Sequence, residues 1–528
     1  MNKSTACEKT TTEPEATHSL TNALDSDSQS LSDDTSRSPS PSPSPPFTVL
    51  SHTEKYLLVI LSASVSIWSS FGAPIYYPAL QVLKKQFNIS EELVNVSVVV
   101  YLAFQGIAPT VFGGLADAYG RRPVLILCLL IFIVSSIIIA ITNNYALLLV
   151  FRIFQASGIA PTVAVCSGMV GDFTERHERG GFIGLQSGLT LMGQAFGALI
   201  GAGLIAGFNW RAIFWFLAIG SGVTLVVISV LLPETKRAIV GNGSIIPSRL
   251  MNRAPLLSFP SVKRRWHLDL PDVSTLEPRG KPDYLAPFKI ILLPEIAICL
   301  LNGAIHFGIW TMLLTSLTHE LSTNYHYSTM KIGLCYLPAG IGGLVGSLVC
   351  GRILDFVYRR RYARYEYKRQ TGAISTDTPF NIVQSRILVI FPYTVITDGF
   401  TVMFGWCLYQ KVHIASVLVS EFCVCMGCIA MIGINMTLLI DLYPSKSSAA
   451  SSSVNLTRCL AGALFVAVLT SMNDKLTVGG TFTLMAGLGV ISTVLLLVPM
   501  KYGMKWGMER EERQKRDMMK KEQELDGN

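Results

Sequence analysis

Residues 113–124 read GGLADAYGRRPV, and a partial copy, GRILDFVYRR, stands at residues 351–360. Each stretch follows an apolar segment and places a carboxylate, Asp117 or Asp355, before a pair of arginines. The same charge order at the ends of two apolar segments indicates that the chain contains two duplicated halves. Parallel repeats of this kind place a substrate site between the halves, near the middle of a bilayer.

The composition indicates that lipid is the solvent. Half of the 528 residues are apolar, 15% are charged, and the mean hydropathy is +0.44. Twelve apolar segments are long enough to cross a hydrocarbon core of about 30 Å as helices. They lie near residues 57–80, 94–115, 123–142, 146–170, 182–206, 211–233, 290–317, 329–354, 386–409, 414–441, 449–471 and 480–500. The sequence therefore predicts an all-α integral membrane protein with twelve transmembrane helices in two six-helix bundles.

The polar segments divide the chain. A first stretch, rich in Ser, Thr, Asp and Glu, ends in Ser-Pro repeats and cannot bury a core. No removable signal peptide is expected. Basic residues in alternate loops place both ends and the central loop in the cytoplasm. The expected parts are a disordered cytoplasmic tail, a first bundle, a central cytoplasmic loop, a second bundle and a cytoplasmic carboxyl tail, at residues 1–52, 53–233, 234–285, 286–503 and 504–528.

Charge and cysteine usage exclude other classes. The net charge is +8, but the basic residues lie beside apolar segments, which membrane topology explains without a nucleic-acid partner. Eleven cysteines lack the paired spacing of a disulfide framework, and Cys423, Cys425 and Cys428 are expected to be small buried side chains. We expect no metal and no cofactor. The absence of a phosphate-binding loop motif favours a chemical gradient over ATP as the energy source.

Polar residues inside apolar segments are the candidates for function. Arg152 and Gln155 lie within one such segment, where a charge is costly and is expected to face the bundle interior. Snorkelling to the outer interface is the alternative for Arg152. Asn302, His306 and Trp310 recur every four residues and so share a helix face. A histidine titrates near neutral pH and a tryptophan stacks on cations, but the three could also serve interhelical hydrogen bonding alone.

Other features of the apolar segments have structural interpretations. Gly193, Gly197 and Gly201 recur every four residues and predict close helix packing. Asp398 is expected to be structural or to line a polar cavity, and Glu421 to lie at the outer interface.

The residues at 113–124 resemble the signature loop of the major facilitator superfamily. Within it the chain is similar to the fungal twelve-helix drug:proton antiporters of the quinidine-resistance type, over roughly residues 55–505. The resemblance implies that Asp117 and Arg121 latch the outward-open state. It also implies a conformational gate formed by Gly113, Asp117, Gly120, Arg121, Arg122 and Asp355.

The resemblance extends to residues inside the helices. It associates the arginine of the fourth helix with proton coupling, so the coupling candidates are Arg152, Gln155 and His306. The glycines of the fifth helix resemble an antiporter motif, although its proline is Ala198 here. Residues expected to line the substrate cavity are Tyr101, Gln105, Asn302, His306 and Trp310.

The expected function is therefore secondary active transport. We expect a monomeric proton-coupled antiporter in the plasma membrane, or alternatively an internal membrane, that exports drugs, weak acids, amino acids or polyamines. A uniporter, a symporter or a non-transporting nutrient sensor on the same fold are alternatives. The protein is not expected to be an enzyme, because the acyltransferase-like spacing at residues 267–272 lacks catalytic context.

Overall fold

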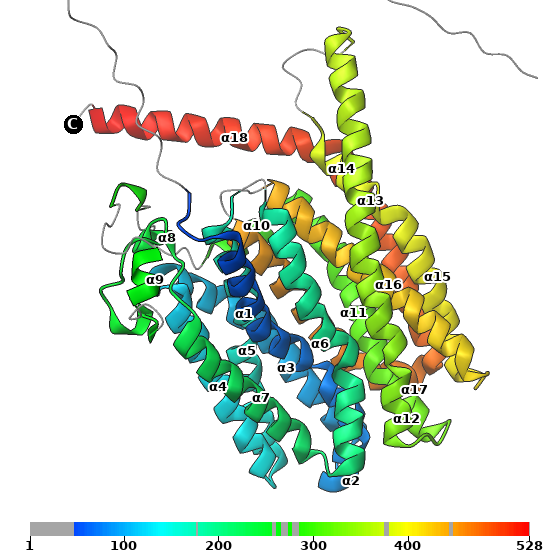
Figure 1. Cartoon of the computed structure of the whole chain (residues 1–528). Helices are drawn as coiled ribbons and strands as arrows, with labels where there is room; N and C mark the ends of the chain where they lie inside the picture. Colours follow the sequence, from blue (N-terminus) through cyan, green and yellow to red (C-terminus); the bar gives the residue numbers. More distant parts are fainter. Residues whose placement is uncertain are drawn as a thin grey trace, which may run out of the picture. The chain divides into compact units, whose positions relative to one another are not determined.

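The computed structural model describes residues 47–175, 178–255, 260–265, 273–276, 285–373, 380–442 and 447–526. The chain divides into one unit of Met1–Pro45 and a second unit, Pro46–Asn528, which contains every described residue. All regular elements among these residues are helices (Figure 1). The all-α expectation is confirmed. The Ser-Pro repeats and the spacing at residues 267–272 lie outside the described residues.

The first half contains six spans, drawn from blue to green in Figure 1. Its first span is interrupted: a 3-10 helix, η1, separates α1 from α2. Helix α5 packs against α3 and α4, and α6 packs against α1 and η1. The elements are α1 (His52–Phe71), η1 (Pro74–Ala79), α2 (Leu80–Phe87), α3 (Glu91–Tyr119), α4 (Arg121–Ile141), α5 (Tyr145–Phe173), α6 (Arg179–Gly207) and α7 (Arg211–Leu231).

Local sequence explains where these helices begin. Ser51 and Glu54 form a reciprocal capping box at the start of α1. Ser90 and Asn144 cap α3 and α5 through their side-chain oxygens. Gly120 joins α3 directly to α4 at φ 111°, a conformation that favours glycine. The tight connection holds together the adjoining ends of α3 and α4.

Short helices occupy the described part of the central segment: α8 (Arg237–Val240), η2 (Leu250–Asn252), α9 (Pro260–Arg265), η4 (Val273–Thr275) and α10 (Ala286–Ile291). The backbone N–H of Val49 donates to the carbonyl of Asn242 at 3.1 Å. The beginning of the described chain therefore packs against the central segment.

The second half follows. Helix α12 ends at Cys335 and α13 begins after Tyr336, where Pro338 occupies the first turn. Helix α16 packs against α11, α13 and α15. The elements are α11 (Pro294–Thr323), α12 (Thr329–Cys335), α13 (Leu337–Gln370), α14 (Ile382–Ile387), α15 (Ile390–Tyr409), α16 (Ile414–Leu442), α17 (Ser447–Leu495) and α18 (Leu497–Asp526).

The number of spans agrees with the sequence. Within the described ranges, 11 helical stretches are long and apolar enough to cross a membrane, and the last, Ala449–Arg510, contains two expected segments. Thr477 inside α17 is not helical, with φ 65° and ψ 165°. Leu300 packs beside Val454, and Asn302 bonds Ser492 at 3.0 Å, so both arms of α17 lie against α11. The chain turns back at Thr477, and the twelve-helix expectation is confirmed.

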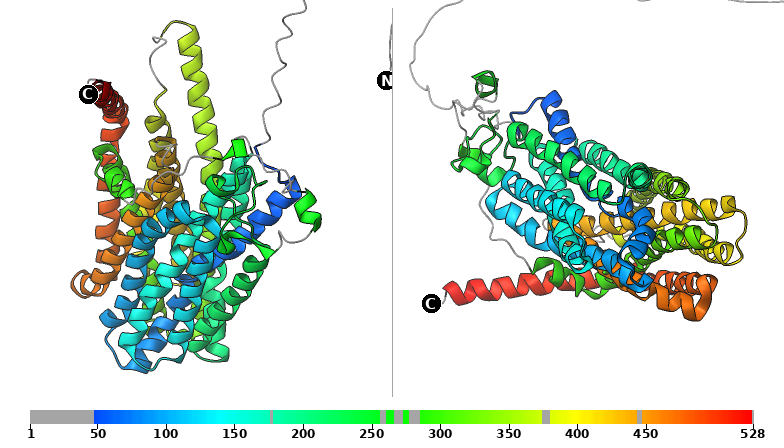
Figure 2. Two further views of the ribbon diagram at one scale, coloured as in Figure 1. Left: turned by 90° about the vertical axis from the view of Figure 1, so that its left-hand side faces the viewer. Right: turned by 90° about the horizontal axis from the view of Figure 1, so that it is seen from below.

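Two helices continue beyond the expected segments. Helix α13 runs to Gln370, and α18 covers most of the expected carboxyl tail. Figures 1 and 2 show both leaving the bundle at the same end. Arg510 of α18 forms an ion pair with Glu295 of α11, so α18 is tied to the start of the second half. The part boundaries drawn from the sequence stay predictions.

Candidate functional site

The two halves meet through stacked tyrosines at the end opposite the signature loop, which we call the outer end because the predicted topology places it outside the cytoplasm. The rings of Tyr77 in η1 and Tyr336 between α12 and α13 are parallel within 5°, with centroids 6.0 Å apart. The hydroxyl of Thr318 donates to the carbonyl of Tyr77 at 3.2 Å and lies 2.6 Å from the Tyr336 hydroxyl. We call Tyr77, Thr318 and Tyr336 the outer contact. All three are buried, so this contact closes the space between the halves on the outer side.

Charged residues join the same ends. His319 Nδ1 of α11 lies 2.7 Å from Glu91 Oε1 of α3, and 3.3 Å from Gln81 Nε2 of α2. Lys84 of α2 lies 3.5 Å from the other Glu91 oxygen. This ion pair connects the halves outside the outer contact. Sequence reasoning missed this ion pair, because its members lie far apart in the chain.

The glycines of α6 lie where this helix approaches the interrupted first span. A β-carbon at Gly193, Gly197 or Gly201 would lie 2.8, 3.0 or 2.2 Å from the nearest atom of α1 or η1. A β-carbon at Gly340 of α13 would lie 2.2 Å from the Cα of Ala195, on another face of α6. Small residues therefore allow α6 to pack closely against both halves.

Arg152 lies inside the first half between two aromatic rings. Its side chain is fully buried, and its guanidinium carbon lies 4.0 Å from the Tyr76 ring centroid and 4.1 Å from that of Tyr101. Its Nη1 donates to Gln155 Oε1 at 2.8 Å, and Gln155 Nε2 donates to Ser136 Oγ at 2.9 Å. We call Tyr76, Tyr101, Ser136, Arg152 and Gln155 the Arg152 centre. The structure therefore shows Arg152 buried in this centre and not snorkelling to the outer interface.

The Arg152 centre is cationic. Within the described ranges no carboxylate forms an ion pair with Arg152, and its Nε and the Tyr101 hydroxyl have no hydrogen-bond partner. Each desolvated cation–π contact contributes up to about 2 kcal/mol, which offsets part of the cost of burying the guanidinium. The centre therefore keeps donor capacity that an anion or a polar acceptor can use. Tyr76, which sequence reasoning missed, is half of this aromatic clamp.

Asn302 and His306 of α11 face the interior of the second half. Asn302 Nδ2 donates to Ser492 Oγ at 3.0 Å and to Thr493 Oγ1 at 2.9 Å. His306 Nε2 lies 3.4 Å from Asp398 Oδ1 of α15, and its Nδ1 lies 2.8 Å from the Asn302 carbonyl. Both His306 and Asp398 are buried. The histidine therefore has an acidic partner on a helix that the sequence alone did not connect with it.

The remaining cavity candidates lie near the boundary between the halves. Trp310 lines a cavity of about 400 Å³ together with Tyr77, Gln194 and Tyr336. The backbone carbonyl of Gln105 accepts a hydrogen bond from Asn455 Nδ2 of α17 at 2.8 Å. A role in lining the substrate cavity stays a prediction for all five candidates, which are Tyr101, Gln105, Asn302, His306 and Trp310.

The signature loop forms a charge cluster at the end of the first half that the sequence predicts to be cytoplasmic. Arg121 Nη2 lies 3.0 Å from Asp117 Oδ1, and Arg121 Nε lies 3.2 Å from Asp172 Oδ2 of α5. Lys236 Nζ, in the segment after α7, lies 2.9 Å from Asp117 Oδ1. We call Asp117, Arg121, Asp172, Glu234 and Lys236 the cytoplasmic charge cluster. Asp117 and Arg121 pair within their own half here, and their role as an outward-open latch stays a prediction.

Glu234 organises this cluster. Its carboxylate accepts hydrogen bonds from the backbone N–H groups of Arg121, Arg122 and the two residues after Glu234, at 2.9–3.2 Å. Burial raises the pKa of Glu234, and these hydrogen bonds oppose the rise. A β-carbon at Gly120 would lie 2.4 Å from Glu234 Oε2. Glycine at 120 therefore satisfies both the backbone conformation and the carboxylate.

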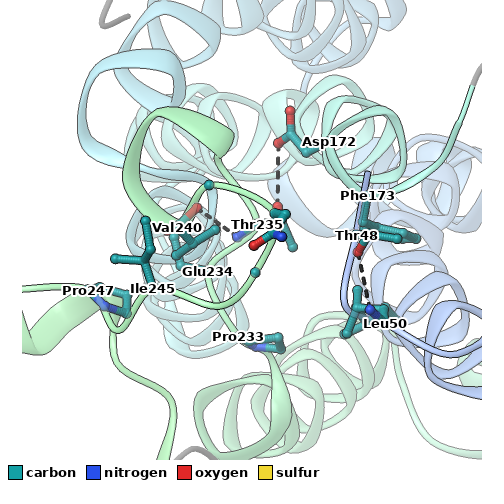
Figure 3. Close-up of a pocket in the computed structure, with 14 residues that line it drawn as sticks. Thr48, Leu50, Asp172, Phe173, Pro233, Glu234, Thr235, Val240, Ile245 and Pro247 are labelled. Atoms are coloured by element: carbon teal, nitrogen blue, oxygen red, sulfur yellow. Dashed lines mark hydrogen bonds between the residues drawn. The ribbon is translucent and has the colours of Figure 1, made fainter. Parts of the chain in front are cut away.

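A cavity of about 490 Å³ lies beside the cluster (Figure 3). Thr235 Oγ1 donates to Asp172 Oδ2 at 3.4 Å, and Thr48 Oγ1 accepts from the backbone of Leu50 at 3.3 Å. The cavity thus brings together the start of the described chain, the end of α5 and the segment after α7.

The other gate candidates lie apart from these ion pairs. The Arg122 guanidinium donates to carbonyls of Ser229, Leu232 and Met251, which ties α4 to the end of α7. A β-carbon at Gly113 would meet nothing within 4 Å. Asp355 on α13 is exposed. The structure therefore brings Asp117, Gly120 and Arg121 together and leaves Gly113 and Asp355 outside the cluster.

The fold and these sites define a membrane transporter built of two matched halves. The profile of the Major Facilitator Superfamily matches residues 59–466, most of the chain. The chain belongs to this superfamily, as the sequence resemblance predicted.

Comparison with known proteins places the chain more narrowly. Multidrug transporter AQR1 of Candida glabrata is 47% identical, over 89% of this chain and 79% of that protein. MFS antiporter QDR1 of Candida albicans is 45% identical, over 86% and 89%. Quinidine resistance protein 1 of Saccharomyces cerevisiae is 42% identical, over 88% and 86%. The expected likeness to the fungal quinidine-resistance type is confirmed.

A solved structure supports the fold. The xylose transporter XylE from E. coli, in a partially occluded inward-open conformation, matches with a TM-score of 0.58 at 12% identity. The match covers 84% of this chain and 97% of that one.

Proposed function

We propose that this protein is a monomeric, proton-coupled antiporter of the plasma membrane that exports drugs or other small organic compounds. The names of its relatives supply the substrate class. The observation that carries the proton coupling is a buried ionisable centre in each half: the Arg152 centre, and His306 with Asp398. Ionisable groups inside a membrane protein are costly, and they commonly mark ion and substrate pathways.

The proposed roles follow from the geometry. His306 can accept a proton while Asp398 stabilises the imidazolium that forms. Arg152, held by Gln155, supplies a fixed positive charge. Its electrostatic interaction energy with the surroundings changes when a substrate or proton arrives. The substrate would contact Tyr101, Gln105, Asn302, His306 and Trp310, and the gate residues around Asp117 would change partners during the cycle.

The test uses the purified full chain in liposomes with radiolabelled quinidine as the probe. A pH gradient imposed without ATP is expected to drive more quinidine into the compartment with the higher proton concentration than the passive trapping of this weak base in protein-free liposomes, and a protonophore is expected to abolish the excess. Accumulation on the opposite side would favour a symporter. Equilibration without accumulation would favour a uniporter, and saturable binding without flux would favour a sensor.

A further inference from the structure

Glu421 is a buried carboxylate without a partner among the described residues. It lies on α16, its side chain is 0% exposed, and neither carboxylate oxygen has a hydrogen-bond partner among the described residues. The sequence predicts that Glu421 sits at the outer interface, but the structure encloses it. The difference arises because α16 packs against α11, α13 and α15, a contact that one apolar segment cannot reveal.

Burial determines the charge of this side chain. An ionised carboxylate without a cation or hydrogen-bond donor is among the most costly groups to remove from water. The neutral acid avoids most of this cost. Glu421 in this arrangement is therefore a protonated carboxyl group.

The neighbours of Glu421 offer no compensating positive charge. The titratable groups that face it are the thiols of Cys335 and Cys425 and the phenol of Tyr336, and across the described helices no cation pairs with it. Helices α11 and α15 contribute no charged side chain to this site among the described residues. An ion pair cannot account for this carboxylate.

Glu421 lies close enough to Tyr336 of the outer contact to interact with it electrostatically. Tyr336, one of the groups that face Glu421, stacks on Tyr77 and bonds to the carbonyl of Leu314 and the hydroxyl of Thr318. When the halves separate at this contact, Tyr336 loses its partner in the first half. The cover between Glu421 and the outer solution then loosens.

The duplication of the fold places Glu421 opposite the Arg152 centre. Helices α5 and α16 are the fourth spans of their halves, and each has 29 residues. Arg152 and Glu421 both lie seven residues after the first residue of their helix. Tyr77 lies within the field of Arg152 as Tyr336 lies within that of Glu421. Side chains of opposite charge type thus occupy the same repeat position, one on each side of the stacked tyrosines.

We propose that Glu421 is a proton-binding site of the transport cycle, protonated while the outer contact is closed and ionised when that contact opens. Opening breaks the carboxyl O–H bond and water takes the proton, and closure takes up a proton again. In the proposed antiport cycle, the proton taken up on closure leaves towards the opposite side while the inner end is open, so the proton crosses the membrane once per cycle. The inference rests on the proposed proton coupling. It adds the residue that links the proton to the outer contact.

The sign of the pH dependence follows from this scheme. Because closure takes up a proton, a fall in pH favours the closed arrangement, and a rise in pH favours opening. The ratio of closed to open molecules can change by at most about tenfold per pH unit for one linked proton.

Hydrogen exchange of the full chain in lipid nanodiscs, without substrate or gradient, tests the proposal. Exchange in peptides that cover η1 and α12 is compared between wild type and Glu421→Gln at the same pH, from about pH 5 to about pH 9. The glutamine variant cannot ionise, so it is expected to stay protected while wild type loses several-fold protection as pH rises. Equal exchange in both proteins at every pH would overturn the proposal.

A matched control separates this effect from the loss of any buried carboxylate. Glu320 of α11 is also buried near the outer end, but its carboxylate accepts a hydrogen bond from Asn324. Glu320→Gln is expected to keep the wild-type pH dependence. If Glu320→Gln abolishes the dependence and Glu421→Gln does not, the assignment to Glu421 is wrong.

A second variant covers the case in which Glu421→Gln does not fold. Glu421→Asp keeps a titrating group on a shorter side chain and is expected to shift the midpoint of the pH dependence; an unchanged midpoint contradicts the proposal. These measurements are separate from quinidine flux. Gradient-driven flux with pH-independent exchange would reject Glu421 alone, whereas pH-dependent exchange without gradient-driven flux would reject the proposed antiport.

Discussion

The outer contact and the cytoplasmic charge cluster lie at opposite ends of the bundle and differ in what they join. The outer contact crosses between the halves, through Tyr77 and Tyr336 and through the nearby ion pair of His319 with Glu91. In the cytoplasmic charge cluster, Asp117 and Arg121 take their partners from the first half and from the segment that follows it. One end therefore holds the halves together and the other stabilises a single half.

The difference shows how a transporter built of two halves can adopt two states. Contacts between halves must break when that end opens, and here they are one pair of stacked tyrosines, single hydrogen bonds and the ion pair of His319 with Glu91. Contacts within a half can be stronger, because that half moves as a unit. Opening of the outer end thus has to overcome the outer contact, while the cytoplasmic charge cluster can persist or exchange Asp117 for a partner across the gap.

Removal of the Arg152 guanidinium is expected to give the largest loss of transport. Arg152→Ala leaves Tyr76 and Tyr101 without the cation between them and Gln155 without its donor, so we expect transport to fall by at least about a hundredfold. Quinidine flux measures the loss, and a fluorescent fusion verifies that the variant reaches the membrane. Ser135→Ala, next to Ser136 in sequence, is the control. Normal flux in Arg152→Ala would remove Arg152 from the mechanism.

Backbone packing beside the outer contact gives the next effect. A β-carbon at Gly201 would lie 2.2 Å from the carbonyl oxygen of Ile75, whereas one at Gly203 would meet nothing within 4 Å. Gly201→Ala is therefore expected to destabilise the fold by about 3 kcal/mol, and Gly203→Ala by much less. Thermal unfolding in detergent compares the two variants. Equal midpoints would show that α6 does not pack on η1 as described.

A similar pair of glycine variants tests the cytoplasmic charge cluster. Gly120 has φ 111° and faces Glu234, so Gly120→Ala is expected to cost about 2 kcal/mol and to slow transport several-fold. Gly113→Ala, whose β-carbon meets nothing within 4 Å, is the matched substitution and should have little effect in this state. Flux and thermal unfolding are measured for both. A larger effect at Gly113 than at Gly120 would mean that the gate contacts form in the state that is closed at the opposite end.

A single hydroxyl group gives the smallest expected effect. Tyr336→Phe keeps the stacked ring but removes the hydroxyl beside Thr318, whose own hydroxyl donates to the carbonyl of Tyr77 across the halves. Without it, that bond is expected to weaken by about 1 kcal/mol, which shifts the closed-to-open ratio about fivefold. Hydrogen exchange in η1 should increase accordingly. Tyr56→Phe, on the exposed face of α1, serves as the control. Unchanged exchange in Tyr336→Phe would mean that stacking alone closes the outer end.

The sequence predicted the spans better than the site. Hydropathy located all twelve helices because a bilayer imposes one length on each, and it separated the two arms of α17 at Thr477. Motif likeness located Asp117, Arg121 and Arg152. The partners of these residues come from other helices, as with Tyr76 beside Arg152, so only tertiary structure reveals them.

The acidic residues show most clearly what the sequence alone cannot predict. Glu421 and Asp398 have similar surroundings in sequence, each within an apolar segment. In the structure Asp398 lies beside His306, while Glu421 has no partner among the described residues. Pairing depends on how helices rotate against each other, which no single segment encodes.

The most direct test of the account asks whether the outer contact must open during transport. Gln81→Cys and His319→Cys replace two side chains that approach within 3.3 Å across the halves, and a short bis-methanethiosulfonate reagent can join them through two disulfide bonds. We predict that the joined protein carries no quinidine and that a reductant restores flux to the level of the unjoined double variant. Full flux in the joined protein would contradict the account, because the substrate would then cross without separation of the outer ends.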